Sequence, residues 1–226
     1  MSDNVLANLE DYQAIYQRAC ERKGGPGAVE SLLSDPLTDG EVALLGDDRF
    51  LAEFSKKVFQ SGFVWRVVRN KWPEFERLFF EFNLDKVLLM PDEMLEQRAQ
   101  DPAIIRNYKK VRTIRDNATL IDSVRREHGS FAQFIALWAY LKKYGARLGG
   151  NTGPYALRAM GKDTFLLSRD VTGYFSQRNI ISGGVNSKRS LNAIQQAFNQ
   201  LQQQSGRSMQ ALSLLIAISV GDNLFS

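Results

Sequence analysis

Residues 140–171 read YLKKYGARLGGNTGPYALRAMGKDTFLLSRDV, and this stretch decides the fold expected for the chain. It predicts a helix that stops at Gly145, a tight glycine-rich turn, and a second helix that stops near Gly161. The glycines allow a left-handed backbone and let another molecule approach closely. Thr152 is the expected N-cap of the second helix, with Pro154 just inside it.

The turn of this hairpin is a candidate anion site. Free N–H groups and the positive end of a helix dipole can hold a DNA backbone phosphate without reading any base. Nearby basic side chains add positive charge. The candidate backbone contacts are Gly149, Gly150, Asn151, Thr152, Gly153, Arg147 and Lys109. An ordinary helix–turn–helix corner with a glycine hinge explains the same pattern.

The order helix, hairpin, helix and loop, followed by an aspartate, resembles the helix-hairpin-helix DNA glycosylases. Asp170 lies 18 residues beyond Thr152, a distance similar to that of the essential aspartate in this superfamily. The resemblance implies that Asp170 stabilises an oxocarbenium-like sugar and orients the attacking water. The alternative is that Asp170 merely caps the helix expected over residues 171–176. Asp163 is the second carboxylate of the loop, expected as a surface turn residue.

A second resemblance covers more of the chain. Residues from about Phe50 to Gly161 are similar to the 3-methyladenine DNA glycosylase I (Tag) family. The stretches that carry it are FQSGFVW at 59–65, NKWPEF at 70–75, EFNLDKV at 81–87, QDPAIIRN at 100–107 and KVRTIRDNA at 110–118. Several such blocks in the right order are stronger evidence than any single block.

The chain departs from the Tag pattern in two places. That family binds zinc with two Cys and two His, whereas this chain has one cysteine, Cys20, and one histidine, His128. A closed zinc site needs four such ligands, so we expect no metal and no cofactor. The family also has a glutamate in its base pocket, eight residues before the tryptophan that matches Trp65. Lys57 occupies that position here.

The resemblance also assigns a base pocket and a DNA wedge. Trp65 matches a pocket tryptophan that could stack on a flipped base, and Lys57 lies beside it in that pattern. Phe63 matches the part that approaches the lesion and is the expected wedge, with Gln60 as the alternative. Core packing is the default explanation for Phe63, and it explains Trp65 about as well as the pocket does. Tyr155 is expected in the core.

The pattern of apolar residues predicts an all-α protein. They recur at helical spacing, including one helix over residues 51–67, and no period-2 pattern persists. A break is expected at Trp72-Pro73. The resemblance implies a helix-hairpin-helix DNA glycosylase fold with two helical lobes around a DNA-facing cleft. We expect an N-terminal helical segment over residues 1–48 and a Tag-like body over residues 49–226, with the hairpin at about 140–160.

Composition and charge are compatible with this interpretation. The chain has 226 residues, 44% of them hydrophobic, and a net charge of +4, which permits DNA binding without proving it. No apolar run reaches the length of about 18 residues typical of a membrane span, and no secretion signal is recognisable. We expect a cytoplasmic monomer that binds damaged double-stranded DNA. The basic clusters are Lys109, Lys110, Arg112 and Arg115; Arg66, Arg69 and Lys71; and Lys142, Lys143 and Arg147.

The predicted function is that of a monofunctional DNA glycosylase. It would hydrolyse the N-glycosidic bond of an alkylated purine, with 3-methyladenine as the first candidate, and so start base excision repair. Bifunctional members of the superfamily carry a lysine next to the hairpin threonine, and this chain has Asn151 there, so we expect no lyase activity. The alternatives are a DNA-binding protein that kept the clamp without the chemistry, and a helical interaction domain.

Overall fold

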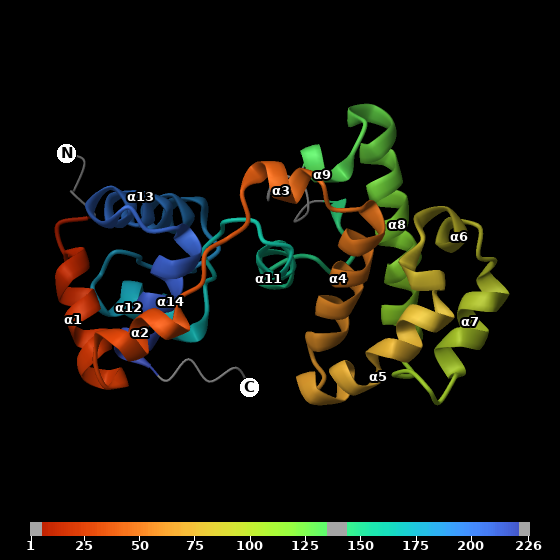
Figure 1. Ribbon diagram of the computed structural model, residues 1–226, viewed down its shortest axis with the longest axis horizontal. Helices are drawn as coiled ribbons and strands as arrows, with labels where there is room; N and C mark the ends of the chain where they lie inside the picture. The colour runs from red at the N-terminus through yellow and green to blue at the C-terminus, as the bar shows by residue number, and fades with distance from the viewer. Residues whose placement is uncertain (1–5, 135–143, 222–226) are drawn as a thin grey trace. The chain divides into compact units, whose positions relative to one another are not determined.

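The protein is all-helical in the part that the structure describes, residues 6–134 and 144–221 (Figure 1). This computed structural model has no strand in those residues, so the predicted all-α class is confirmed. None of the helices described there is both long and apolar enough to cross a bilayer.

The chain divides into two compact units, each described by itself below. Residues 37–162 form the first, here called the hairpin unit, and residues 1–36 with 163–225 form the second, here called the terminal unit. These units differ from the segments 1–48 and 49–226 expected from the sequence, because the N-terminal helices pack with the C-terminal ones. That segmentation follows family resemblance rather than packing and stays a prediction.

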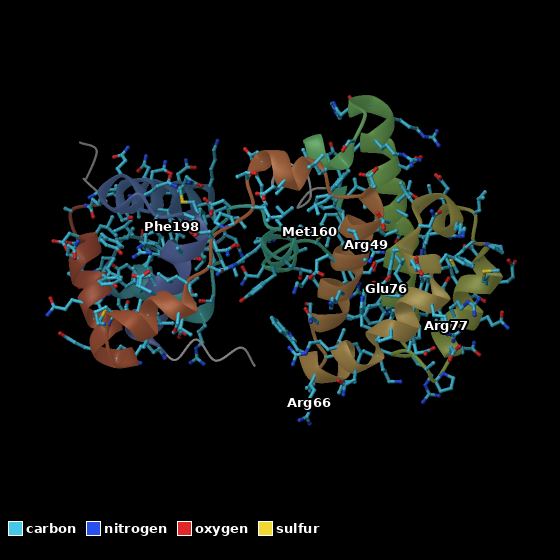
Figure 2. All side chains as sticks on the ribbon, in the orientation of Figure 1. Arg49, Arg66, Glu76, Arg77, Met160 and Phe198 are labelled. Carbon is cyan, nitrogen blue, oxygen red and sulfur yellow. The ribbon has the colours of Figure 1, made fainter. Side chains whose placement is uncertain are left out.

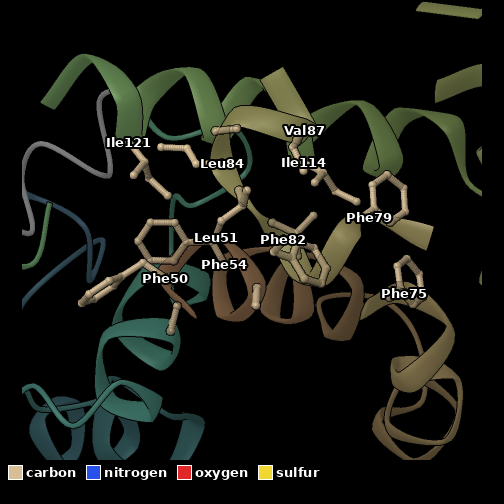
Figure 3. Packing of buried hydrophobic residues seen from close by; sticks show 14 of the residues in the cluster. Phe50, Leu51, Phe54, Phe75, Phe79, Phe82, Leu84, Val87, Ile114 and Ile121 are labelled. Atoms are coloured by element: carbon tan, nitrogen blue, oxygen red, sulfur yellow. The ribbon is translucent and has the colours of Figure 1, made fainter. Parts of the chain in front are cut away.

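The hairpin unit is built around its longest described helix, α8. The elements of this unit are α3 (Asp39–Ala43), α4 (Asp47–Gln60), α5 (Trp65–Leu78), η1 (Phe80–Phe82), α6 (Leu84–Leu88), α7 (Asp92–Gln100), α8 (Tyr108–His128), α9 (Phe131–Phe134) and α11 (Thr152–Ala159). Helix α8 packs against α4, α6, α7 and α9, while α11 packs against α4. Figure 3 shows the aromatic and aliphatic side chains that fill the space between α4 and α8.

Helix α8 has clear start and stop signals. The Asn107 side chain caps it by accepting a hydrogen bond from Lys110 N at 3.1 Å. Gly129, with φ of 82°, ends it. Between them, apolar residues such as Ile114 and Ile121 recur at a spacing of seven and lie fully buried on one face. Because several of the other residues of α8 are charged, it is the burial of this apolar face that stabilises the helix in the protein.

Two details of the helix pattern differ from the expectation. The single helix expected over residues 51–67 is broken, because Gly62 adopts a φ of 111° that ends α4 and starts a turn. The break expected at Trp72-Pro73 is wrong, since Pro73 lies inside α5. The Trp72 ring stacks on Phe75 at 5.2 Å and on Phe82 at 5.3 Å. The packing of Trp72 offsets the loss of the backbone hydrogen bond that Pro73 cannot donate.

A polar cluster joins α4 to α5 beside this aromatic stack. Arg49 pairs with Glu76 at 3.3 Å, and Trp72 Nε1 donates to Glu76 Oε1 at 3.0 Å. Figure 2 labels Arg49 and Glu76 on these two helices. The cluster fixes the orientation of α5, whose first residue is Trp65.

The terminal unit consists of α1 (Tyr12–Lys23), α2 (Pro26–Leu32), α12 (Arg169–Gln177), α13 (Lys188–Ser205) and α14 (Met209–Val220). Helix α14 packs against α1, α12 and α13. Phe198 of α13 is fully buried and stacks on Phe165 at 4.4 Å. Asp163 adds to the cap of α14, whose N-cap is Ser208, by accepting from Met209 N at 3.2 Å and Gln210 N at 2.9 Å. It was expected as a surface turn residue, but it is half-buried and stabilises the start of α14.

The chain enters and leaves the hairpin unit at one place. Leu37 N donates to Gly161 O at 2.8 Å, and Lys162 Nζ pairs with Asp39 at 2.6 Å. Gly161 has a φ of 85°, and the Leu37 side chain lies where a Cβ on that glycine would stand. Glycine is required there for both reasons.

The loop that leads into the hairpin is held by Asn117 of α8. This side chain is fully buried. Its Oδ1 accepts from Ala146 N at 2.8 Å, and its Nδ2 donates to Ala146 O at 3.1 Å. One amide thus satisfies both backbone groups of a residue outside regular structure.

Replacing Asn117 with alanine should destabilise the protein by about 1–3 kcal/mol, because both polar groups of Ala146 lose their partner. Chemical unfolding of Asn117→Ala measures this change. Thr119→Ala, an exposed position on the same helix, is the matched control and should change the free energy of unfolding by less than about 0.5 kcal/mol. Equal effects of the two variants would contradict the assignment.

Candidate active site

A pocket opens in the hairpin unit where three helix ends meet. It has a volume of about 160 Å³. The end of α4, the start of α5 and the start of α11 form its walls. Its lining residues are Lys57, Gln60, Ser61, Trp65, Asn151, Thr152 and Tyr155. Lys57 and Tyr155, which are 155 − 57 = 98 positions apart in the sequence, therefore line one site.

Two aromatic rings form part of the wall. The centroids of Trp65 and Tyr155 lie 6.0 Å apart, and the rings stand at 88° to one another. This edge-to-face arrangement is favourable for two aromatic rings. Tyr155 was expected in the core, but it is only half-buried and faces the pocket. Burial raises the pKa of its phenol, which therefore stays uncharged at neutral pH.

Lys57 is the charged residue of this wall. Its Nζ lies 5.4 Å from the centre of the Trp65 ring, a cation–π contact. The same Nζ pairs with Glu53 Oε1 at 3.1 Å and donates to Gln60 Oε1 at 3.1 Å. Because Lys57 lies in the last turn of α4, the helix dipole also favours its positive charge.

Gln60 is 6% exposed. An ammonium group can only donate, so the bond from Lys57 fixes which end of the Gln60 amide is the oxygen. The amide nitrogen is thereby left as a donor next to the pocket. This position fits a pocket residue better than the wedge for which Gln60 was the alternative.

The second half of the predicted hairpin, the glycine turn and α11, lies in the described residues, whereas its first helix falls largely on residues 135–143, outside them. Gly150 has a φ of 59°, as does the exposed Arg147. Asn151, rather than Thr152, is the N-cap of α11, and its side chain makes no capping hydrogen bond. Thr152 was expected to cap and instead begins the helix. Gly153, the second residue of α11, is buried.

Of the other predicted backbone contacts, Gly149 and Lys109 are exposed. Phe63 lies in the turn between α4 and α5 and is half-buried, with its ring 5.1 Å from Lys110 Nζ. The structure thus leaves part of this ring accessible, as a wedge requires, and packs the rest against the core.

The sequence placed Lys110 in a basic cluster that could face DNA, but the structure buries this side chain. It is 6% exposed, and its Nζ donates to Val58 O and Ser61 O, both at 2.5 Å. Burial, with a smaller effect of Arg147, lowers the pKa of this ammonium. Its position after Asn107, on the same face as Val111 and Ile114, is the signal that could have identified it.

The other basic clusters are also partly structural. Lys71 donates to the carbonyls of Pro102 and Ala103 at 2.6 and 3.1 Å, and Arg115 pairs with Asp92. Arg66 remains exposed at the start of α5, where its side chain points away from the helices (Figure 2). Arg69 and Arg112 are exposed too. Lys142 and Lys143 lie outside the described residues.

Asp170 lies in the first turn of α12, in the terminal unit. Ser168 caps this helix by accepting from Val171 N at 3.3 Å, so the alternative that Asp170 is the cap is wrong. The half-buried Asp170 carboxyl packs against Gly221 and leaves no room for a Cβ there. The pocket residues all belong to the hairpin unit, so a catalytic role for Asp170 stays a prediction.

The residues of the chain do not fit a zinc site of the Tag kind. Cys20 lies in α1 of the terminal unit, and His128 ends α8 of the hairpin unit. Within the described ranges, no group of three or more His, Cys, Asp or Glu side chains is placed to bind a metal ion.

Comparison with known proteins identifies what the chain resembles. A family model described as "Methyladenine glycosylase" matches residues 42–157, slightly more than half of the chain. This segment contains every residue that lines the pocket. A search of curated proteins finds no match.

Solved structures of 3-methyladenine DNA glycosylase I are similar at low identity. One is 23% identical, covers 51% of this chain and 79% of its own, and gives a TM-score of 0.47. A structure from Staphylococcus aureus is 16% identical, covers 97% and 84%, and gives 0.42. A variant from the same organism is 20% identical, covers 78% and 79%, and gives 0.41.

Replacing Lys110 with methionine should loosen the turn that carries Phe63, because Val58 O and Ser61 O lose their donor. We expect the free energy of unfolding to fall by about 1–2 kcal/mol, since relief of the buried charge offsets part of the loss. Amide hydrogen exchange at Gly62 and Phe63 should become faster. Lys109→Met, next to it but exposed, is the control; faster exchange in both variants, or in neither, would contradict this role.

Proposed function

The chain belongs to the methyladenine glycosylase family, and we propose that it is a monofunctional DNA glycosylase that hydrolyses the N-glycosidic bond of an alkylated purine. The observation that carries this proposal is the aromatic pocket of Trp65 and Tyr155, which lies entirely within the segment that matches the family. The first candidate substrate is 3-methyladenine, and the reaction would start base excision repair.

The pocket has the chemistry that a planar heterocycle needs. Two aromatic rings offer apolar faces for stacking. Gln60, Asn151 and Thr152 offer amide and hydroxyl groups to the edge of a base. A glycosylase must turn its target out of the duplex to reach the bond, and the cost of unstacking is smallest for a damaged base.

The surface of the hairpin unit supports binding to the DNA backbone. In the turn before α11, Gly149, Gly150 and Asn151 are exposed, and so are the basic residues Arg147 and Lys109. Such contacts carry no base specificity and fix the duplex in place. Phe63, held half-exposed by the turn after α4, is the proposed wedge for the vacated stack. We propose that the protein acts as a monomer.

Asp170 is the proposed catalytic carboxylate. As the bond between the sugar and the base breaks, positive charge develops on the sugar, and a carboxylate stabilises that charge. The same group can orient the water that forms the new C1′–O bond. Asn151 stands where a Schiff-base lysine would be needed, which supports hydrolysis without strand cleavage.

A DNA-binding protein that kept the clamp without catalysis is the second candidate. The same hairpin supports it, because a phosphate site needs no carboxylate. Release of a free base separates the two candidates, since only the enzyme produces it.

Asp170→Asn should abolish base release, with a loss of at least about 100-fold, because the amide cannot stabilise positive charge. The assay measures free 3-methyladenine from methylated duplex DNA, with a chelator present to test independence from metal. Asp163→Asn is the matched control: it weakens the cap of α14 and should lower Tm while the rate at 25 °C is kept. Undiminished release by Asp170→Asn would refute the assignment.

Arg147→Ala should weaken binding to duplex DNA severalfold and lower the slope of log K against log salt by about one, the value for one phosphate contact. Fluorescence anisotropy at several salt concentrations measures both quantities. Arg77→Ala removes an equally exposed cation that pairs with Glu74 at 2.8 Å, and should leave the slope unchanged. Identical slopes for both variants would show that Arg147 does not contact the backbone.

A further inference from the structure

A row of three polar side chains runs along α4 and ends at the pocket. Glu53, Lys57 and Gln60 follow one another at spacings of four and three residues, so they share one face of the helix. Lys57 Nζ pairs with Glu53 Oε1 at 3.1 Å and donates to Gln60 Oε1, also at 3.1 Å. We propose that this row holds the Gln60 amide as a hydrogen-bond donor that recognises an acceptor on the edge of a purine base. The inference rests on the proposed function in so far as it concerns the base that the enzyme releases.

The charge of Lys57 is compensated within this row. Its side chain is 14% exposed, and that of Glu53 is 17% exposed. The two opposite charges lie in contact, so their effects on a ligand in the pocket largely cancel. The group that the row presents to a ligand is therefore the neutral amide of Gln60, and the pocket stays open to a cationic base.

The free end of the Gln60 amide is accessible from the pocket. Gln60 is 6% exposed and lines the pocket, and its oxygen is taken by Lys57. Within the described part of the chain, the buried side-chain nitrogen and oxygen atoms that lack a hydrogen bond are Arg98 Nε, Tyr174 Oη and Gln210 Oε1. Gln60 Nε2, which donates to no described residue, is not among them. This nitrogen is therefore open to a ligand that enters the pocket.

The orientation of this amide determines which bases fit. A glutamine that can rotate offers either an oxygen or an N–H group to a ligand. An ammonium has donors only, so Lys57 removes the first choice and Gln60 offers the N–H group. A base with a ring nitrogen or a carbonyl oxygen at that position forms a hydrogen bond. A base with an N–H or methyl group there leaves a buried donor without a partner, which lowers its affinity.

A neutral donor also suits the chemistry proposed for the site. Before release 3-methyladenine is cationic, and an amide does not repel it as an unpaired ammonium would. When the bond between C1′ and N9 breaks, both of its electrons go to the base, which leaves as a neutral molecule. Water forms the new C1′–O bond and loses a proton to solvent. Because the ring nitrogens gain electron density in this step, the hydrogen bond from Gln60 strengthens towards the transition state.

The first test follows the binding of free 3-methyladenine, which is uncharged in mildly alkaline buffer. The proteins are the wild type, Gln60→Met, Gln60→Glu and Gln97→Met. Methionine fills the space of the glutamine without a polar group, whereas glutamate keeps the size and an oxygen for Lys57 but has no N–H group. Gln97, exposed on α7 of the same unit, is the matched control. Titration gives Kd, and NMR of the side-chain amides reports on Gln60 itself.

We expect Gln60→Met and Gln60→Glu to weaken binding by about three- to tenfold, the value of one hydrogen bond, while Gln97→Met matches the wild type. In the wild type, the side-chain N–H signal of Gln60, identified by its loss in Gln60→Met, should move downfield when the base binds. An unmoved signal, undiminished affinity in Gln60→Glu, or the absence of binding to the wild type would overturn the proposal.

A second comparison tests Lys57 and Glu53 as positioning residues. The double variant Glu53→Gln with Lys57→Met removes the fixed orientation without a change in net charge. The Gln60 amide then divides between two orientations, and the apparent Kd should rise by at least about twofold. Its N–H signal in the ligand-free protein should shift towards that of the exposed Gln97. Lys56→Met, outside the pocket, is the control and should do neither. An unchanged Gln60 signal in the double variant would contradict the role of the row.

Base release keeps the inference separate from the proposed function. If the wild type releases no base from methylated duplex DNA, the proposed function fails, while the binding of 3-methyladenine still decides the inference. If it releases 3-methyladenine, Gln60→Met should lower kcat/KM by about threefold or more, and Gln97→Met should keep the wild-type value. Equal release by all three proteins would overturn the inference and leave the proposed function intact.

Discussion

Two buried polar side chains on one face of α8 position the parts of the candidate active site. Lys110 holds the turn after α4 through two carbonyl groups, and Asn117, two helical turns later, holds the loop that enters the hairpin. The pocket lies between the elements that these residues fix. A buried polar group destabilises the protein unless its hydrogen-bond partners are in place. The turn after α4 and the loop before the hairpin are therefore restricted to the conformations that supply these partners.

Helix ends determine the electrostatics of the site. Lys57 lies at the end of α4, where the negative end of the helix dipole favours a cation, and the positive end of α11 opens into the same pocket. The aromatic walls of Trp65 and Tyr155 lower the local polarity, which strengthens both effects. The site therefore combines two aromatic stacking surfaces with amide and hydroxyl groups, a combination suited to a planar heterocycle.

The sequence predicted the helical class, the glycine turn before α11 and the meeting of Trp65 and Lys57, because local signals and family blocks carry these features. It misplaced Tyr155 and Lys110 because residue type alone suggests core for a tyrosine and surface for a lysine. Whether a side chain lies in a core or a pocket depends on which distant segment faces it. The cap of α12 was missed for another reason, since Ser168 and Asp170 are both good capping residues and only the backbone geometry selects Ser168.

The hydrogen bond from Leu37 N to Gly161 O brings the two ends of the hairpin unit together. A continuous stretch of more than one hundred residues thus interrupts the terminal unit as an inserted domain whose entry and exit are clasped at one point. Closing this loop costs little more than closing a much shorter one, because the entropy of closure grows only with the logarithm of its length. The clasp makes the hairpin unit a self-contained module. The inner loops of this unit can therefore change in length without altering the path of the chain through α12, the helix that carries Asp170.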